Sequence, residues 1–221
     1  MPTKNISLKI SSTLGKVSAK ITDARRPKFV LTLAHGAGAG MDHPFMKALA
    51  EELSLFSVTT MRYNFPYMEG QKGRPDSPPV ATKTVEMAVQ KARSLYPRLP
   101  VFVSGKSFGG RMTSQWVSKE APDFVKGIVF FGFPLHQPGV PSMERAEHLY
   151  SIKVPMLFLQ GTRDSLADLT MLKKVIKKLP TATLVTFEKA DHSFKAGKEN
   201  LLPKLAAVTA EWMSGQMVNV K

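Results

Sequence analysis

A short segment, residues 105–109, reads Gly-Lys-Ser-Phe-Gly and matches the pattern G-x-S-x-G. It follows the apolar run Val101–Ser104 and precedes residues with helical spacing. In a sharp turn from strand to helix, side chains two positions before and after the serine would collide with the turn, so both positions require glycine. The turn lifts the serine hydroxyl above the sheet edge, and the first amides of the helix point toward an incoming oxyanion. The pattern therefore predicts Ser107 as a nucleophile for acyl transfer.

Two nucleotide-binding alternatives fail on spacing. Gly105-Lys106-Ser107 resembles the end of a phosphate-binding loop, but that motif needs a glycine at position 100, which is proline. The run Gly36-x-Gly38-x-Gly40 is one residue shorter than a dinucleotide fingerprint. The chain has 0 Cys, which removes thiolate ligands and a cysteine nucleophile. We expect neither an organic cofactor nor a metal ion.

A serine nucleophile needs a base and an acid that orients it. His192 lies in a loop after the last predicted strand and is the only one of the 5 His in such a place beyond Ser107. Asp164 directly follows another predicted strand, and Asp168, one helical turn later, is its rival. Either Asp could instead favour the first turn of the next helix. The order Ser107, Asp164, His192 along the chain is typical of α/β hydrolases.

The oxyanion formed during acyl transfer needs backbone donors. One is the N–H of Phe108, directly after the nucleophile. The second is expected in the loop His-Gly-Ala-Gly-Ala-Gly at 35–40, whose small residues let the backbone approach a substrate closely. We assign it to the N–H of Ala37, with Gly38 as second choice. Gly36 and Gly38 are expected to contact the substrate.

Basic residues follow several predicted strands. Lys106 precedes the nucleophile, Arg62 lies at the end of its strand, and Arg163 precedes the acid. These cations could attract an anionic substrate, so Lys106 and Arg62 are candidate substrate ligands. The alternative is surface or structural ion pairing.

The chain as a whole is also basic, with 31 Lys and Arg against 17 Asp and Glu and a net charge of +14. Such a charge raises the expectation of an anionic partner. A ridge of four lysines between 173 and 178 lies opposite the apolar face of its helix, which a solvated helix also explains. Because no nucleic-acid-binding motif is present, we expect no specific nucleic-acid partner.

The sequence predicts strands and helices in alternation, and these elements must position the candidate site residues. Continuous or alternating apolar runs predict strands, and apolar residues three and four apart predict helices. A Pro- and Gly-rich loop without periodicity is expected at Asn64–Pro79. The repeated strand–helix–strand order predicts a doubly wound, mostly parallel sheet with helices on both faces, and ligands bind such sheets at the carboxyl ends of the strands. The predicted strands are Ile6–Ile10, Val17–Ile21, Phe29–Ala34, Val58–Tyr63, Val101–Ser104, Ile128–Phe133, Met156–Gln160 and Thr183–Phe187, and the helices cover 45–55, 85–95, 108–119, 166–179 and 201–212.

The 221 residues predict a single domain, 1–221. Residues 134–155 have room for a short helix near Ser142–Tyr150 but not for a cap domain. No apolar run approaches 18 residues, so no membrane span is expected. The first residues lack the apolar core of an export signal, and together with the absence of Cys this favours a cytoplasmic location.

Five segments carry a resemblance to a known family, which covers nearly the whole chain. They are 35–40, Met61–Tyr67, Gly105–Arg111, Phe131–His136 and 160–164. The sequence resembles the α/β-hydrolase superfamily and, within it, a small cap-less branch. This branch is similar to dienelactone hydrolases and to testis-expressed and chromatin-complex-associated hydrolase-like proteins. The resemblance implies an eight-stranded core and a Ser–Asp–His triad at the positions above. The chain departs from the dienelactone hydrolases in having Ser107 where they have Cys.

These observations predict a serine hydrolase that cleaves a small ester or related acyl substrate, anionic esters included. Ser107, Asp164 and His192 would form the triad and an acyl-enzyme intermediate. The same machinery serves thioesters and peptides, which the sequence does not separate. The alternative is a non-catalytic basic binding module that keeps the hydrolase fold.

Overall fold

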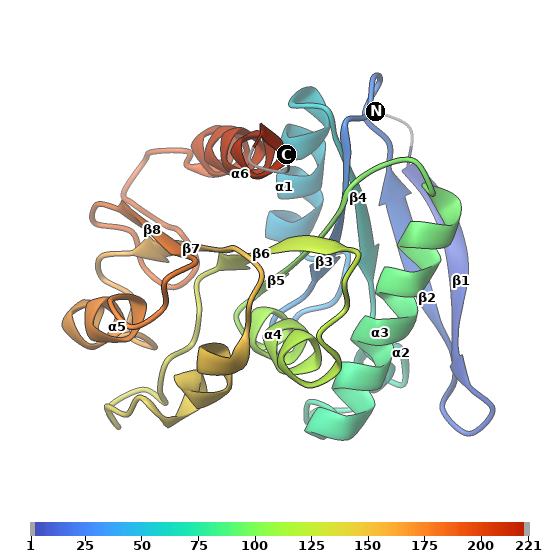
Figure 1. Cartoon of the computed structure of the whole chain (residues 1–221). Helices are drawn as coiled ribbons and strands as arrows, with labels where there is room; N and C mark the ends of the chain where they lie inside the picture. The colour runs from blue at the N-terminus through green and yellow to red at the C-terminus, as the bar shows by residue number, and fades with distance from the viewer. Residues whose placement is uncertain (1–2, 219–221) are drawn as a thin grey trace.

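One eight-stranded sheet runs through the part of the chain that the structure describes. The computed structural model covers residues 3–218, and its strands lie in the order β1-β2-β4-β3-β5-β6-β7-β8 (Figure 1). The strands are β1 (Thr3–Ser11), β2 (Gly15–Thr22), β3 (Phe29–Ala34), β4 (Val58–Tyr63), β5 (Val101–Lys106), β6 (Val125–Phe131), β7 (Met156–Gly161) and β8 (Ala182–Phe187). The six strands from β4 to β8 are parallel, and the hairpin β1–β2 adds an antiparallel edge. The predicted α/β-hydrolase fold with a mostly parallel sheet of eight strands is confirmed.

The central strands are buried along their whole length, and β3 and β7 carry one polar side chain each. Every residue of β3, β4 and β7 is buried, because helices cover both faces of the sheet. The hairpin strand β2 instead alternates buried Val17, Ala19 and Ile21 with more exposed residues, as expected for an edge with one face in the core.

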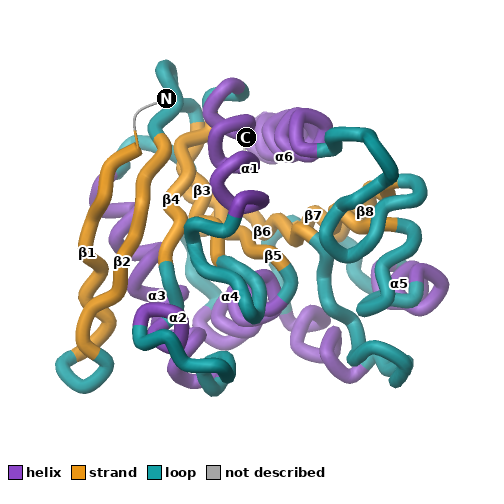
Figure 2. Tube along the Cα trace, turned by 180° about the vertical axis from the view of Figure 1, so that it is seen from behind, coloured by secondary structure: helices purple, strands orange, loops and turns teal. Residues whose placement is uncertain are grey.

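The helices divide between the two faces of the sheet, as the two views show (Figures 1 and 2). The helices α1 (Pro44–Leu55) and α6 (Leu202–Val218) pack together on one face, where Leu49 and Leu205 share a core. The other face carries α3 (Pro78–Leu95), α4 (Phe108–Glu120), the 3₁₀ helix η1 (Glu144–Ser151) and α5 (Leu169–Ile176). Between β6 and β7 the chain forms loops and η1, with no separate cap domain within this described segment.

Two sequence predictions about elements need correction. The stretch Asn64–Pro79 is not wholly irregular: it contains the short helix α2 (Pro66–Glu69) and the first two residues of α3. Both helices begin with proline, whose fixed φ suits the first helical turn, so these prolines start helices here. The helix expected from 166 begins only at Leu169, because Asp168 caps it.

The order of the strands determines where a ligand site can form. From β3 the chain crosses to β4 on one side, and it later returns to place β5 on the other side of β3. The loops after β3 and β5 therefore diverge at the carboxyl edge of the sheet and leave a crevice between them. Within residues 3–218 no helix combines the length and the apolar character needed to cross a membrane.

Candidate active site

Ser107 occupies a strained turn between β5 and α4. Its backbone has φ 52° and ψ −117°, a conformation that non-glycine residues rarely adopt. A Cβ at Gly105 would lie 2.3 Å from the Gly109 carbonyl carbon, and one at Gly109 would lie 2.5 Å from the Ala34 carbonyl oxygen. Both glycines are therefore required by contact with backbone, as the G-x-S-x-G pattern predicts.

A chain of two hydrogen bonds joins Ser107 to a buried carboxylate. His192 Nε2 lies 2.8 Å from Ser107 Oγ, and His192 Nδ1 lies 2.7 Å from Asp164 Oδ2. Because a carboxylate only accepts, the proton of the neutral imidazole belongs on Nδ1, which leaves Nε2 to accept from the serine hydroxyl. The structure thus brings the three predicted residues together in the tautomer that a general base requires.

Asp164 follows β7 and is held by several donors. Its side chain is fully buried, and it accepts hydrogen bonds from the Leu166 N–H and the Gln160 side-chain amide as well as from His192. The rival acid Asp168 instead accepts from the Met171 N–H at 2.8 Å and caps α5. The geometry favours Asp164 as the partner of the imidazole.

Hydrogen bonds of two buried side chains, His35 and Tyr67, brace the loop after β3. His35 is fully buried; its Nδ1 lies 2.9 Å from the Gly36 carbonyl and its Nε2 accepts from the Phe65 N–H at 3.0 Å. Tyr67 Oη also donates to the Gly36 carbonyl. These contacts brace the loop that carries Ala37, one of the two predicted oxyanion donors. The other is Phe108, whose amide lies in the first turn of α4, where backbone N–H groups have no acceptor within the helix.

Burial of His35 should make the protein less stable in acid. Burial lowers the pKa of His35 from 6.5 to about 4, so the unfolded chain binds this proton at a higher pH than the folded one. Stability that is fully present above pH 6.5 is then lost as the pH falls toward 4. We expect this residue to account for a loss of about 2 to 3 kcal/mol in the free energy of unfolding between pH 7 and pH 4.5, measured by urea titration.

A glutamine at 35 isolates this contribution, because its oxygen can accept from the Phe65 N–H without titrating. The His35→Gln variant should lose about 2 kcal/mol less than the wild type over the same pH interval. The exposed His43 provides the control, and His43→Gln should follow the wild type. An equal loss in the wild type and in His35→Gln would contradict the assignment.

A cavity of about 570 Å³, here named the Ser107 cavity, opens beside the serine. Ser107, His192, Gly36 and Ala37 lie at one side of it. Its remaining wall is mostly apolar and comes from the start of α1 and the turn before α5: Ala39, Pro44, Phe45, Met46 and Leu166, with His43, Ser193 and two lysines, Lys106 and Lys195, as its polar members. Within the described part of the chain no carboxylate lines this cavity. It can hold a compact apolar group and favours a negative charge.

The predicted substrate ligands are not all in this cavity. Arg62 is only 2% exposed; its guanidinium donates to the Met41 carbonyl at 2.8 Å and lies 3.9 Å from Asp42. Burial lowers the pKa of Arg62, and the nearby carboxylates oppose this shift. Arg62 thus braces the loop before α1 and does not line the cavity, contrary to the prediction. Arg163 and Gly38 are exposed and are also absent from its lining.

Several residues that line the cavity were missed in the sequence, among them Lys195 and Leu166. Lys195 lies three residues after His192, in the same loop after β8, so the rule that ligands meet strand ends could have found it. Leu166 was expected on a helix face, and its place in the turn after Asp164 depends on where α5 begins. Lys106 lines the cavity as predicted, but its Nζ donates to the His192 carbonyl at 2.6 Å.

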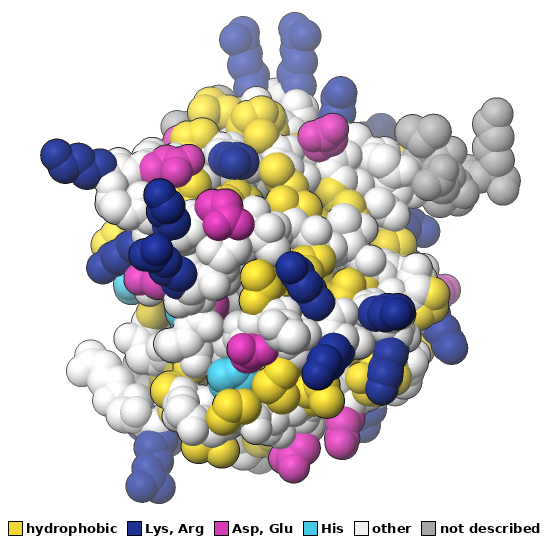
Figure 3. Space-filling model, turned by 90° about the vertical axis from the view of Figure 1, so that its left-hand side faces the viewer, with side chains coloured by type: hydrophobic (Ala, Val, Ile, Leu, Met, Phe, Trp, Pro, Cys, Tyr) yellow, Lys and Arg dark blue, Asp and Glu magenta, His cyan; other side chains and the backbone are white. Residues whose placement is uncertain are grey.

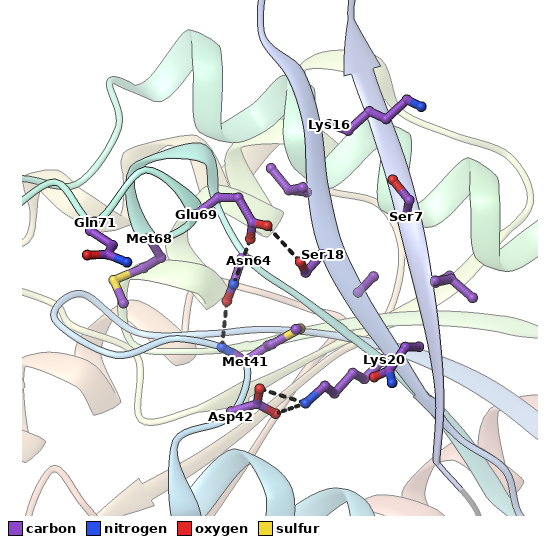
Figure 4. Close-up of a pocket in the computed structure, with 14 residues that line it drawn as sticks. Ser7, Lys16, Ser18, Lys20, Met41, Asp42, Asn64, Met68, Glu69 and Gln71 are labelled. Carbon is purple, nitrogen blue, oxygen red and sulfur yellow. Dashed lines mark hydrogen bonds and ion pairs between the residues drawn. The ribbon is translucent and has the colours of Figure 1, made fainter.

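A second hollow, of about 580 Å³, lies beside the hairpin β1–β2 (Figure 4). Its charged groups bind one another: Lys20 Nζ donates to Asp42 at 2.7 Å, and Glu69 accepts from Ser18 and Asn64. No histidine is among the described residues that line it. Among residues 3–218 there is also no group of three or more His, Cys, Asp or Glu side chains that could hold a metal ion. The Ser107 cavity is therefore the candidate active site.

Comparison with known proteins identifies the class. Residues 27–213 match the family model described as an alpha/beta hydrolase domain, and the chain belongs to this family. The solved structure of a dienelactone hydrolase from Anabaena variabilis is 19% identical, with a TM-score of 0.80 over 97% of each chain. Est1E from Butyrivibrio proteoclasticus is 14% identical, with a TM-score of 0.76 over 97% of this chain and 99% of its own.

A third solved structure has a similar fold. A serine hydrolase without a lid from Xanthomonas campestris is 16% identical, with a TM-score of 0.70 over 99% of this chain and 95% of its own. At such identities these likenesses concern the fold. The family match shows an alpha/beta hydrolase and supports hydrolase activity, and the three structures share its fold.

Proposed function

We propose that this protein is a serine hydrolase that cleaves a small ester or related acyl substrate through an acyl-enzyme. One observation carries the proposal: the unbroken chain of hydrogen bonds from Ser107 through His192 to Asp164, at the carboxyl edge of the sheet. The three side chains come from three different loops. Ser107 also has a strained backbone, and strain of this kind is typical of residues at functional sites.

In the first half of the reaction, Ser107 Oγ attacks the acyl carbon. His192 Nε2 takes the serine proton, and the N–H groups of Phe108 and Ala37 stabilise the oxygen that becomes negative. Asp164 holds the imidazole in orientation and stabilises its positive charge. The tetrahedral intermediate then collapses, His192 passes the proton to the leaving group, and the acyl group stays on Ser107.

In the second half, water enters from the open side of the cavity. His192 removes a proton from it, and the resulting hydroxide attacks the acyl carbon, again with the oxyanion held by the two N–H groups. Collapse returns the proton to Ser107 Oγ and releases the carboxylic acid. None of these steps needs a cofactor.

Labelling with a fluorophosphonate tests the proposal without knowledge of the natural substrate. The wild type should be labelled at one serine, Ser107, and pretreatment with the probe should abolish hydrolysis of p-nitrophenyl esters. A panel of p-nitrophenyl esters of different acyl length, beside acyl thioesters and peptide amides, would then define the acyl class. A protein that is neither labelled nor active on any of them would point to the non-catalytic binding module.

The Ser107 cavity suggests the kind of acyl substrate. Phe45 stacks on Phe194 with ring centroids 5.9 Å apart and, with Met46 and Leu166, offers an apolar surface. Lys195 is exposed at the rim, and no hydrogen bond or ion pair of its side chain occurs within the described residues. We therefore expect the enzyme to prefer a substrate that has a compact apolar group and, elsewhere on the molecule, a negatively charged group.

Replacing Lys195 with glutamine should weaken this preference. At low ionic strength, kcat/KM for an ester bearing a carboxylate should fall by about three- to tenfold, while the value for its neutral isostere should stay within about twofold. The difference should shrink near physiological salt, because an exposed charge is screened over about 8 Å there. The measurement is the ratio of the two kcat/KM values across a salt series.

Lys198→Gln is the matched control, since Lys198 is exposed in the same segment but does not line the cavity. It removes the same charge and should leave the ratio unchanged. If both variants change the ratio equally, or if the neutral ester is hydrolysed as well as the anionic one at every salt concentration, the charge is a general surface property.

The alternative of a basic binding module draws on the net charge of +14. Figure 3 shows Lys and Arg side chains spread over the face of the molecule that carries α5 and β8. The lysines of the ridge, Lys173, Lys174, Lys177 and Lys178, are all exposed there. Binding of nucleic acid through this ridge does not involve Ser107. A non-catalytic binding module would not be labelled by the fluorophosphonate, whereas a serine hydrolase would be, so the labelling experiment separates the two functions.

A further inference from the structure

A lysine side chain joins the nucleophile turn to the loop that carries the base. Lys106 is the last residue of β5 and directly precedes Ser107. Its Nζ donates to the main-chain carbonyl of His192 at 2.6 Å. The imidazole of that same residue lies 2.8 Å from Ser107 Oγ. Lys106 and Ser107, which are adjacent in sequence, thus both contact His192: Lys106 binds its main-chain carbonyl, and Ser107 binds its ring.

The end of β6 leaves space for this contact. Gly132 follows β6 with φ +72°, a region that glycine enters without strain. A Cβ at this position would lie 3.2 Å from Lys106 Nζ and 3.5 Å from the His192 ring. The backbone at 132 therefore favours glycine, and a side chain there would lie against both the ammonium group and the imidazole.

Burying a lysine is unfavourable, and its surroundings offset part of that cost. Burial lowers the pKa of Lys106 to about 8, while the charges of Asp164 and Asp191 act in the opposite direction. The Phe194 ring adds a weak cation–π contact, with its centroid 5.7 Å from Nζ. A cation kept in this position through such specific contacts indicates a role for the amine beyond filling space.

Hydrogen bonds within the turn Asp191–Lys195 join the backbone around His192 to one side chain, Asp191. Asp191 Oδ1 accepts from the N–H groups of Ser193 and Lys195, and the Asp191 N–H donates to the Lys195 carbonyl. Phe194 is buried and anchors the turn against α1 through Phe45. The loop is also held to the segment after β7, where the Arg163 N–H donates to the Ala190 carbonyl and the Lys189 N–H donates to Thr162 Oγ1. The Lys106 hydrogen bond adds a contact between the backbone of the loop and the end of β5, directly beside Ser107.

We propose that Lys106 is a positioning residue, whose hydrogen bond to the His192 carbonyl keeps the imidazole within hydrogen-bonding distance of Ser107. The inference rests on the proposed function. Proton transfer needs about 2.6–3.2 Å between the heavy atoms, and a displacement of about 1 Å can cost about a hundredfold in rate. Lys106 therefore contributes to turnover rather than to capture of the substrate.

Lys106→Met removes the amine and keeps a long unbranched side chain. We expect kcat for p-nitrophenyl acetate to fall by about ten- to a hundredfold with KM changed by less than about twofold, and fluorophosphonate labelling to slow by a similar factor. The exposed Lys198 provides the control, and Lys198→Met should keep wild-type values. Circular dichroism and the unfolding midpoint verify that each variant is folded.

Chemical rebuilding of the amine distinguishes positioning from packing. Since the chain has 0 Cys, Lys106→Cys carries a unique thiol that can be alkylated in the unfolded state before refolding. Treatment with 2-bromoethylamine restores an ammonium at the length of lysine, and 1-bromopropane gives a neutral chain of the same length. We expect the aminoethyl form to regain activity to within about threefold of wild type refolded in the same way, and the propyl form to stay as low as Lys106→Met.

The outcomes separate this inference from the proposed function. Equal activity of the aminoethyl and propyl forms would overturn the positioning role, because volume alone would then suffice. A Lys106→Met variant with wild-type kcat would overturn it as well, while fluorophosphonate labelling of Ser107 would leave the hydrolase proposal standing. If Lys106→Met does not fold, the two alkylated forms still decide the question, since they differ only in the terminal group.

Discussion

Replacing Ser107 with alanine is expected to reduce ester turnover by about 10⁴-fold or more while leaving the fold intact. The alanine removes the oxygen that forms the acyl-enzyme and that lies 2.8 Å from His192 Nε2. What remains is catalysis by the oxyanion donors and by binding, which is small by comparison. The measurement is kcat for a p-nitrophenyl ester together with loss of fluorophosphonate labelling.

Ser114→Ala is a matched control for this prediction. Ser114 lies on the same helix, α4, and its hydroxyl also contacts an imidazole, with Oγ 2.7 Å from His148 Nε2. That pair lies away from the Ser107 cavity lining. We expect Ser114→Ala to keep turnover to within about threefold. Equal turnover in the wild type and Ser107→Ala, after contaminating esterases have been removed, would end the enzyme proposal.

Exchanging Asp164 for asparagine should lower kcat by a similar amount, about 10⁴-fold. The carboxylate only accepts hydrogen bonds and so keeps the proton on His192 Nδ1. An asparagine can present its NH₂ group to Nδ1, which favours the opposite tautomer and leaves Nε2 protonated and unable to accept from Ser107. The effect should appear in kcat, measured at saturating ester, with little change in KM.

The neighbouring acid provides the comparison. Asp168 caps α5 through the Met171 N–H and makes no hydrogen bond or ion pair with His192. Because asparagine also caps helices well, Asp168→Asn should leave kcat within about twofold and cost at most about 0.5 kcal/mol of stability. If Asp168→Asn reduces kcat more than Asp164→Asn does, the assignment of the acid is wrong.

The order of the strands and helices was predictable because the chain repeats the same local pattern. Strands such as β3 and β7 are apolar at nearly every position, as is typical of strands that are buried on both faces. Ser107, Asp164 and His192 could be located because each follows a predicted strand, and parallel strands bring their carboxyl ends to one edge. Their meeting within hydrogen-bonding distance follows from the register of β5, β7 and β8.

Residues whose roles depend on side-chain direction were less predictable. Arg62 and Lys106 both lie at strand ends, but Arg62 turns toward Met41 and Asp42, and Lys106 toward His192. The direction depends on strand alternation and on which helix covers each face. The directions of the Arg62 and Lys106 side chains therefore cannot be derived from the number of residues between two motifs.

The sequence by itself determined the elements that generate the chemistry: the glycines that permit the turn at Ser107, and the apolar strands that precede Asp164 and His192. These are local requirements, because each concerns backbone within a few residues. Only the tertiary structure decided the shape and charge of the Ser107 cavity and the contact between Lys106 and His192. The physical reason is that these features join residues far apart in the sequence, 86 positions in the case of Lys106 and His192, and their relative placement depends on how the helices pack on the sheet.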